Sequence, residues 1–274
     1  MKMSFTVSEV APYINWIYFF HAWGTAHMPP LDKAQLQAEA EQRLLRYGQR
    51  YHAHGLFKVF RAYSSGDDII VSRPFGDDTP MEVRIPCLRQ QQQGSECLCL
   101  SDFIAPANSS YQSRVAIFAT TVDDAMEHDF DDDPYEKMMM QLLADRLAEA
   151  AAERLHEKVR KVYWGYARHE HLSIAEMLNE RWQGIRPAVG YPSLPDASLN
   201  FVFNHLINFR QIGIRLTDSG AMKPHASVSG MMISHPEARY FSVGTIGEDQ
   251  LNDYAHRRGI PVESIRKFLA SNLA

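Results

Sequence analysis

The sequence predicts an α+β fold, and three observations support this class. Apolar residues at three- or four-residue spacing predict several helices, the longest over residues 136–162. Short β-branched runs beside turn residues predict strands and hairpins. The two kinds of segment do not alternate as they would in a regular βαβ sheet. No internal repeat or Pro/Gly/Ser-rich linker interrupts the chain, so one continuous domain is expected.

The first half of the sequence predicts one helix and three strands. Leu, Ala, Glu and Arg recur at helical spacing over residues 34–47. A strand over residues 69–71 follows the turn signal Gly66-Asp67-Asp68. The β-branched, apolar runs at residues 83–88 and 115–121 predict two further strands.

An acidic stretch precedes the clearest helix. Seven acidic residues lie between Asp123 and Asp133, without the alternation, central glycine and closing glutamate of an EF-hand loop. Negative charge is favourable at a helix N-terminus, so this stretch is expected to lead into the following helix. That helix, residues 136–162, has one apolar face and about seven turns.

The second half predicts helices and one hairpin. A capping box, Ser173 with Glu176, opens a helix over residues 173–182. Further helices are predicted over residues 198–209, 247–258 and 262–269, and two strands over residues 226–233 and 239–246, joined by a turn at His235-Pro236. Residues 199–209 are strongly apolar, which indicates either a buried helix or an interface with a partner chain.

Composition excludes several classes of protein. The chain has 274 residues and a formal net charge of −5, which argues against a generic binder of nucleic acids or anionic membranes. The longest apolar candidate, residues 14–23, is about half the ~20 residues needed to span a bilayer. The N-terminus lacks the features of a signal peptide. Three cysteines are an odd count that suits a reducing compartment, so a cytoplasmic location is expected.

The common catalytic motifs are missing from the sequence. There is no G-x-G-x-x-G, P-loop or G-x-S-x-G segment. No metal site is expected, since no histidine or cysteine group has the spacing of a metal-binding motif. Structural roles are therefore expected for the residues that carry ligand or nucleophile chemistry: His52, His54, Cys97, Cys99, Ser227 and Ser229, with His169-Glu170-His171 in an exposed loop.

Several distinctive blocks occur in order along almost the whole chain. They are Tyr13-Ile14-Asn15-Trp16, Leu88-Arg89-Gln90-Gln91, Asp102-Phe103-Ile104-Ala105-Pro106, residues 143–149 and 156–166, Gln183-Gly184-Ile185-Arg186-Pro187-Ala188-Val189-Gly190-Tyr191-Pro192, residues 226–230, Ser234-His235-Pro236 and Tyr240-Phe241. Together they resemble the activation (AdoMet-binding) domain of vitamin B12-dependent methionine synthase.

The resemblance implies both a fold and a function. The fold is an α+β domain over residues 1–274, with a bent antiparallel sheet and flanking helices. The domain would bind S-adenosylmethionine (AdoMet) and support reductive methylation of inactive cob(II)alamin to methylcobalamin, with an electron from a flavodoxin-type donor. It would thereby reactivate methionine synthase, a methyltransferase of methionine biosynthesis, with little activity alone. Nucleic acids and membranes are not expected partners.

The chain shows no recognisable cobalamin, folate or homocysteine module. The expected arrangement is therefore an apparently stand-alone activation subunit or a domain excised from a longer chain. If it stands alone, it would meet the cobalamin-binding module of a partner chain in trans.

The resemblance also assigns binding positions. Arg186 would bind both oxygens of the AdoMet carboxylate in a bidentate manner. Pro187 favours an extended backbone at Arg186, and Ala188 and Gly190 would allow adenine to approach the backbone closely. Tyr191 would face the ligand and the corrin. Without the family match, the favoured interpretation is that Arg186 merely ties down its own loop.

Further positions lie elsewhere in the chain. Tyr240 and Phe241 would line the AdoMet groove, and strand alternation would turn one of them inward. The carboxylates of Glu149 and Glu180 could balance the ammonium or sulfonium charge. No catalytic residue is expected, because the sulfonium is already a good leaving group and the domain supplies proximity and orientation.

Asn15 departs from the pattern of the family, which usually has Asp at this position. Asn keeps the shape but replaces a charge-assisted hydrogen bond with a neutral one, so weaker AdoMet binding is expected, by about 1 kcal/mol. This departure keeps an alternative open, an AdoMet-independent docking or capping module for a corrinoid protein. A small-molecule methyltransferase is disfavoured, since neither a Gly-rich nucleotide loop nor a general base is evident.

Overall fold

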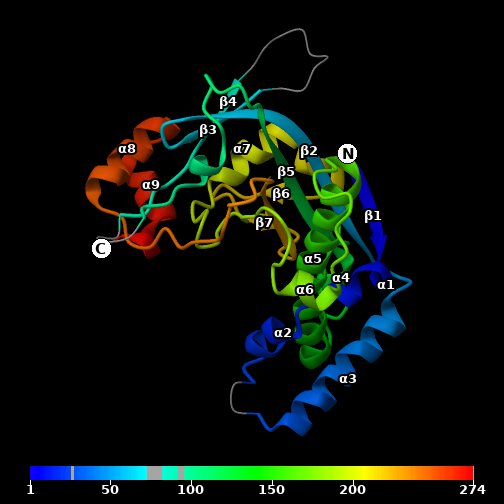
Figure 1. Cartoon of the computed structure of the whole chain (residues 1–274). Coiled ribbons are helices and arrows are strands. Elements are labelled where there is room, and N and C mark those ends of the chain that lie inside the picture. Colours follow the sequence, from blue (N-terminus) through cyan, green and yellow to red (C-terminus); the bar gives the residue numbers. More distant parts are fainter. Residues whose placement is uncertain (26–27, 73–81, 92–95, 274) are drawn as a thin grey trace. The chain divides into compact units, whose positions relative to one another are not determined.

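A computed structural model describes residues 1–25, 28–72, 82–91 and 96–273 (Figure 1). The chain divides into two compact units, each built from three separate stretches. Unit 1 comprises Met1–Phe57, Ala119–Trp182 and Asn208–Val228, and unit 2 comprises Lys58–Phe118, Gln183–Ile207 and Ser229–Ala274.

The described residues form a six-stranded sheet in the order β4-β3-β2-β5-β8, with β1 paired to β2. Its strands are β1 Lys2–Thr6, β2 His52–Ser65, β3 Asp68–Ser72, β4 Glu82–Pro86, β5 Ser113–Val122 and β8 Ser227–Ile233. The pairings of β1 with β2, β2 with β3 and β3 with β4 are antiparallel. The predicted α+β class with an antiparallel sheet is therefore confirmed.

Unit 1 is organised around the long helix α5. Its helices are α1 Val7–Val10, α2 Trp16–Ala22, α3 Pro30–Tyr47, α4 Ala125–His128, α5 Pro134–Lys158 and α6 Ile174–Leu178, and a small hairpin pairs β6 Arg215–Leu216 with β7 Met222–Lys223. The apolar face of α5 is buried, from Met139 to Leu155. As the sequence predicts, the acidic stretch leads into this helix, and the Asp133 carboxylate accepts the N–H groups of Tyr135 and Glu136.

The end of α5 departs from the prediction. The α-helix stops at Lys158, and a π-helical turn covers Val159–Tyr163. Near this end, Glu157 accepts hydrogen bonds from Tyr13 Oη at 2.7 Å and from Arg154 Nη1 at 2.6 Å. These contacts tie the segment before α2 to α5, which gives two of the family-like blocks a structural role.

Unit 2 has its own apolar core beside β4. Its helices are α7 Leu199–Ile207, α8 Glu248–Arg258 and α9 Val262–Phe268. Leu251 of α8 and Ile265 of α9 pack with Leu88 and Ile246 in this core. Helix α7 buries Leu199, Phe203 and Ile207, which supports the buried-helix interpretation of this apolar segment. It ends two residues earlier than predicted, at a left-handed Asn208.

The predicted strand over residues 239–246 is wrong, and so is the hairpin at His235-Pro236. This segment has no strand ladder, and other parts of unit 2 satisfy its backbone. The N–H of Val243 donates to Pro192 O at 2.9 Å, and Ser242 O accepts from the Gln90 side chain at 2.8 Å. A left-handed Gly244 interrupts the extended run.

Other elements differ in extent. Helix α6 begins with the predicted capping box of Ser173 and Glu176, but it ends at Leu178, four residues before the predicted end. The sequence analysis missed α2, β1 and the 14-residue strand β2. The remaining predicted helices and strands are present, with ends displaced by a few residues.

The Glu157 network gives a pH-dependent prediction. Burial alone would raise the pKa of Glu157, but hydrogen bonds from Tyr13 and Arg154 bring it below its usual value of 4.5. A carboxyl whose pKa is lowered by folding stabilises the fold above its unfolded pKa, and this contribution disappears as the pH falls through the folded pKa. Glu157→Gln should therefore lower the free energy of unfolding at pH 7 by about 1–2 kcal/mol.

Urea unfolding of both proteins between pH 7 and pH 3 measures this effect. The difference between them should shrink as the pH falls below about 4.5. Glu41→Gln on the exposed side of α3 is the control, and should change the free energy of unfolding by less than about 0.5 kcal/mol. A Glu157→Gln deficit that is constant with pH would contradict the prediction.

Candidate functional site

The segment from Gln183 to Pro192 lies along β8 as an additional edge within unit 2. Ile185 and Ile233 exchange two backbone hydrogen bonds, both at 2.9 Å. Further along, Met231 N donates to Pro187 O at 3.1 Å. The segment is extended and then turns, without a helix, as its prolines and glycines predict. Its geometry is therefore set by the strand beside it.

Two glycines allow this close approach. A Cβ on Gly230 would lie 2.3 Å from Pro187 O and 2.8 Å from the Phe118 ring. A Cβ on Gly184, whose φ is +85°, would lie 2.2 Å from Ile233 O. Real Cβ atoms do not tolerate such distances from backbone, so only glycine fits at either position. The sequence analysis placed both glycines in family-like blocks but gave neither a role.

Arg186 is held at the centre of this edge. Its backbone N–H donates to the Tyr240 hydroxyl at 2.9 Å, and its guanidinium carbon lies 5.8 Å from the centre of the Phe118 ring. The side chain is partly buried. The structure thus brings together two of the predicted binding residues, Arg186 and Tyr240.

The turn that follows presents an aromatic side chain outward. Tyr191 N donates to Ala188 O at 3.2 Å, and Gly190 N donates to Leu194 O at 2.9 Å. Gly190 has a φ of +87°, and a Cβ at this position would meet nothing within 4 Å. Tyr191 is 49% exposed. Open space at Gly190 and an exposed Tyr191 leave this face of the turn accessible to a ligand.

The segment with Tyr240 and Phe241 is fastened to the same turn. The Ser193 hydroxyl donates to Phe241 O, and Phe241 N donates to Ser193 Oγ at 3.2 Å. Phe241 is partly buried against the core of unit 2, whereas Tyr240 is 36% exposed. One ring is therefore turned inward as expected, although hydrogen bonds to the turn, not strand alternation, set its direction.

Gln90 supports this arrangement from the Leu88–Gln91 block. Its side-chain amide donates to Ser242 O at 2.8 Å and accepts from Leu98 N at 3.0 Å. The neighbouring Arg89 is held by Asp67 and Asp102 at distances of 2.7–2.9 Å. The hydrogen bond to Asp102 raises the pKa of the Arg89 guanidinium. Sequence reasoning did not identify this supporting role.

The other three predicted positions belong to unit 1. Glu149 lies on α5 with its carboxylate 2.8 Å from Arg146 Nη1, and 31% of its side chain is exposed. Glu180 is exposed and left-handed, with a φ of 56°, two residues after α6. Asn15 is the N-cap of α2, and its Oδ1 accepts from Ile17 N at 3.1 Å.

The histidine- and acid-rich segments have structural partners. His54 contacts Ser4 Oγ at 3.0 Å and Asp123 at 2.7 Å, and Asp123 also accepts the N–H of His52. Glu170 does not fit the expected exposed loop, because it forms an ion pair at 2.5 Å with the fully buried Arg160. That guanidinium also packs on the Trp182 ring at 5.0 Å, so Glu170 compensates a buried charge.

One group of described residues has its ligand atoms close enough to hold a metal. Asp124, Glu127 and His128 bring one ligand atom each within 4.8 Å of the others. Glu127 already accepts the N–H of Ala226 at 2.6 Å, and the other two side chains are exposed. Exposed acidic groups of this kind are common without an ion, and we assign no metal here.

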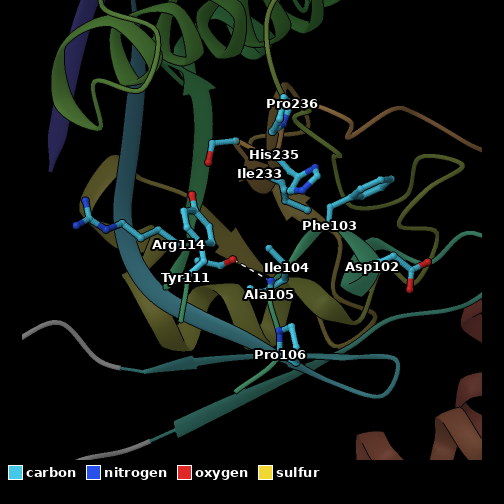
Figure 2. A pocket seen from close by; sticks show the side chains of 12 residues that line it. Asp102, Phe103, Ile104, Ala105, Pro106, Tyr111, Arg114, Ile233, His235 and Pro236 are labelled. Atoms are coloured by element: carbon cyan, nitrogen blue, oxygen red, sulfur yellow. Dashed lines mark hydrogen bonds between the residues drawn. The ribbon is translucent and has the colours of Figure 1, made fainter. Parts of the chain in front are cut away.

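A cavity of about 420 Å³ lies elsewhere in unit 2, among residues 102–106, 111–114 and 233–236 (Figure 2). None of the predicted binding residues lines it. The Arg186 edge and this cavity therefore share no predicted binding residue, although Ile233 both lines the cavity and pairs with Ile185 of the edge.

The fold and this edge define a class of protein, an α+β domain with a partly exposed segment, interrupted by prolines and glycines, along an antiparallel sheet. The family model "Vitamin B12 dependent methionine synthase, activation domain" matches residues 6–259. A crystal structure described as the MetH reactivation domain bound to AdoHcy is 37% identical, with a TM-score of 0.91 over 100% of this chain and 90% of that chain. The chain belongs to the family of activation domains of vitamin B12-dependent methionine synthase.

The resemblance seen in the sequence is thereby confirmed. Among the described residues, no helix combines the length and the apolar character needed to cross a bilayer.

The glycine contacts give a prediction that separates steric exclusion from backbone strain. Gly230→Ala should push Pro187 and Ala188 away from β8 and lower the free energy of unfolding by about 2–4 kcal/mol, as overpacking and a lost backbone contact do. Gly190→Ala meets no atom and should cost only about 1 kcal/mol, because its positive φ is strained for alanine. Thermal unfolding of both variants measures the difference, and equal losses would contradict it.

Proposed function

We propose that the chain binds AdoMet along the Arg186 edge and supports the reductive methylation of cob(II)alamin to methylcobalamin. The observation that carries the proposal is the contact between Arg186 and Tyr240, beside the accessible face of the turn at Gly190 and Tyr191. The AdoHcy bound to the homologous MetH domain supports a ligand of this class. AdoHcy differs from AdoMet by the methyl group and charge on sulfur.

The residues of this edge suit such a ligand chemically. Arg186 offers a planar guanidinium that can bind both oxygens of a carboxylate. Its guanidinium lies by the Phe118 ring, which restricts the side chain before a ligand arrives. The backbone at Gly190 is open on one side, which suits an adenine that is recognised by backbone groups, whereas Ala188 is buried against Gly230. Tyr240 and Tyr191 add exposed aromatic surface.

The family match also implies the unit 1 positions, which we propose as further contacts. Glu149 and Glu180 carry carboxylates that would balance the positive charge of AdoMet. Asn15 would contribute its side-chain oxygen, shared with the Ile17 N–H that this oxygen already accepts.

Binding and orientation are the contributions of this chain. Cobalamin on a partner module would supply the nucleophile, a flavodoxin-type donor would supply the electron, and AdoMet would supply the methyl group and be converted to AdoHcy. No side chain need donate or accept a proton, because the sulfonium is a leaving group without protonation. The chain holds the methyl donor in place and excludes competing reactions. We therefore expect little activity from the domain alone and reactivation of methionine synthase when it acts in trans.

The use of Asn15 as a helix cap favours a second candidate, an AdoMet-independent docking or capping module for a corrinoid protein. With its oxygen engaged by Ile17 N, Asn15 has no acceptor to spare for an ammonium group unless that oxygen is shared. The two candidates differ in whether AdoMet binds and whether Arg186 is needed.

Calorimetric titration with AdoMet tests the first proposal. We expect saturable 1:1 binding that Arg186→Ala abolishes and that Asn15→Asp strengthens about fivefold, or about 1 kcal/mol, by restoring a charge-assisted hydrogen bond. Asp caps helices as well as Asn does, so the Asn15→Asp fold should be unchanged. Arg266→Ala, at an exposed ion pair on α9, is the control for loss of an arginine. Absence of binding in the wild type and in Asn15→Asp would favour the docking module.

Reactivation in trans tests the chemistry. Tyr191→Phe keeps the half-exposed ring and removes only the hydroxyl, and its melting temperature is compared with that of the wild type to check the fold. We expect slower recovery of methionine synthase that has been inactivated as cob(II)alamin, with AdoMet and a reduced flavodoxin-type donor present, and no recovery with Arg186→Ala. Recovery at the wild-type rate with both variants would contradict the proposed role of this edge.

A further inference from the structure

The cavity shown in Figure 2 is a second ligand site in unit 2, and we infer that it takes a small planar aromatic carboxylate. Its volume of about 420 Å³ falls within the range of about 300–1,000 Å³ that is usual for small-molecule sites. The inference rests on the shape and chemistry of this cavity and does not depend on AdoMet binding at the Arg186 edge.

The wall formed by residues 102–106 is held firmly by hydrogen bonds. Ser64 N donates to Ala105 O at 3.0 Å, and the Ser64 hydroxyl donates to Ile104 O at 2.7 Å. On the other side, Ala105 N donates to Ser113 Oγ at 2.9 Å, the dashed line in Figure 2. These hydrogen bonds hold the wall within unit 2, so the cavity is preformed and does not depend on a ligand for its shape.

The interior surface is aromatic and apolar. Ile104 and Ile233 are almost completely buried. The Phe103 ring and the His235 imidazole face the same space in Figure 2, with their centres 6.2 Å apart and their planes inclined by 37°. Tyr111, 66% exposed, stands at the opening. Flat rings on several sides suit a flat ligand, which can stack on one ring and meet the edge of another.

Hydrogen-bond donors point into this space. Ser113 is only 6% exposed, and its oxygen accepts from Ala105 N, which leaves the hydroxyl proton to be donated. His235 Nδ1 accepts from Glu237 N at 3.2 Å, so the proton of a neutral ring resides on Nε2. Both side chains therefore offer donors, and a ligand that brings acceptor atoms satisfies them.

The charges around the cavity favour an anion. The acidic residue of the lining, Asp102, is bound by both Arg89 Nη atoms at 2.7–2.8 Å and by Cys99 N at 2.8 Å, and Figure 2 shows its carboxylate turned away from His235. Arg114 adds a positive charge at the rim, with its guanidinium extending away from the two rings (Figure 2). The lining thus carries a positive charge and an acid that is already neutralised, which disfavours a cationic ligand.

Three probes of one shape test this inference, namely benzoate, benzamide and benzamidine, which carry charges of −1, 0 and +1. Each is titrated into the full chain while the amide resonances of Ala105, Ser113 and Ile233 are followed by NMR. We expect saturable shifts at these amides with benzoate at least tenfold tighter than benzamidine, and benzamide between them. Shifts from no probe, or binding of benzamidine equal to that of benzoate, would overturn the inference.

Two variants locate the binding. His235→Phe keeps a ring but removes the donor, and should weaken benzoate at least fivefold. Arg114→Gln changes an exposed side chain that the fold does not need, and should reduce the preference for benzoate over benzamide about twofold. His256→Phe, an exposed histidine on α8, is the control and should change neither value. Unchanged benzoate affinity in both cavity variants would also overturn the inference.

AdoMet titration of His235→Phe and Arg114→Gln gives an independent readout, because neither residue belongs to the proposed AdoMet edge. If AdoMet binds and benzoate does not, the cavity inference fails while the proposed function stands. If benzoate binds and AdoMet does not, the proposed function fails while the cavity inference stands.

Discussion

The arrangement of unit 2 depends on one close contact, where the backbone at Pro187 and Ala188 meets β8 at Gly230. A hydrogen at Gly230 is the only substituent that fits, because a Cβ would lie 2.3 Å from Pro187 O. This contact brings the extended segment within hydrogen-bonding distance of β8, so that Ile185, Pro187 and Val189 all pair with it. The position of Arg186 between these paired residues is therefore a property of the backbone and needs no ligand to establish it.

A second set of hydrogen bonds fixes the segment at residues 240–243 against the same turn. Ser193 holds Phe241, and Pro192 O accepts the N–H of Val243, so the turn and the segment form one piece. Gln90 closes the arrangement by binding Ser242 O. The Tyr240 hydroxyl in turn accepts the backbone N–H of Arg186 in the edge. The Leu88–Gln91 block, which has no obvious chemistry, is thus a support for the proposed binding residues.

The sequence predicted the elements whose signals are local. Helix α5 has a buried apolar face from Met139 to Leu155, and Ser173 with Glu176 forms the predicted capping box. Strand β2 was missed because Gly55, Lys58 and Arg61 interrupt its alternation, while β1 and β5, which are distant in sequence, contribute to its burial. The error at residues 239–246 has the same origin, since β-branched and aromatic residues there pair with side chains and a turn.

The candidate site follows the same division between local and long-range information. The sequence predicts a shaped loop from Pro187, Gly190 and Pro192, and the structure has a turn there. The need for glycine at position 230 is invisible in the sequence, because a glycine inside an apolar run normally signals only a weaker strand. The residue that a Cβ at position 230 would meet, Pro187, lies more than forty residues away in the sequence.

Asn15 shows how one residue can satisfy the fold and still alter ligand binding. As the cap of α2 it needs only a side-chain oxygen that accepts the N–H of Ile17, and Asn and Asp supply that oxygen equally well. The stability of the helix therefore favours neither residue over the other. A cationic ligand does distinguish them, since a carboxylate retains a second oxygen and a full charge after capping, whereas the amide has a single, uncharged oxygen that the cap already engages. Any effect of this position on AdoMet must then be electrostatic, and it should weaken with added salt.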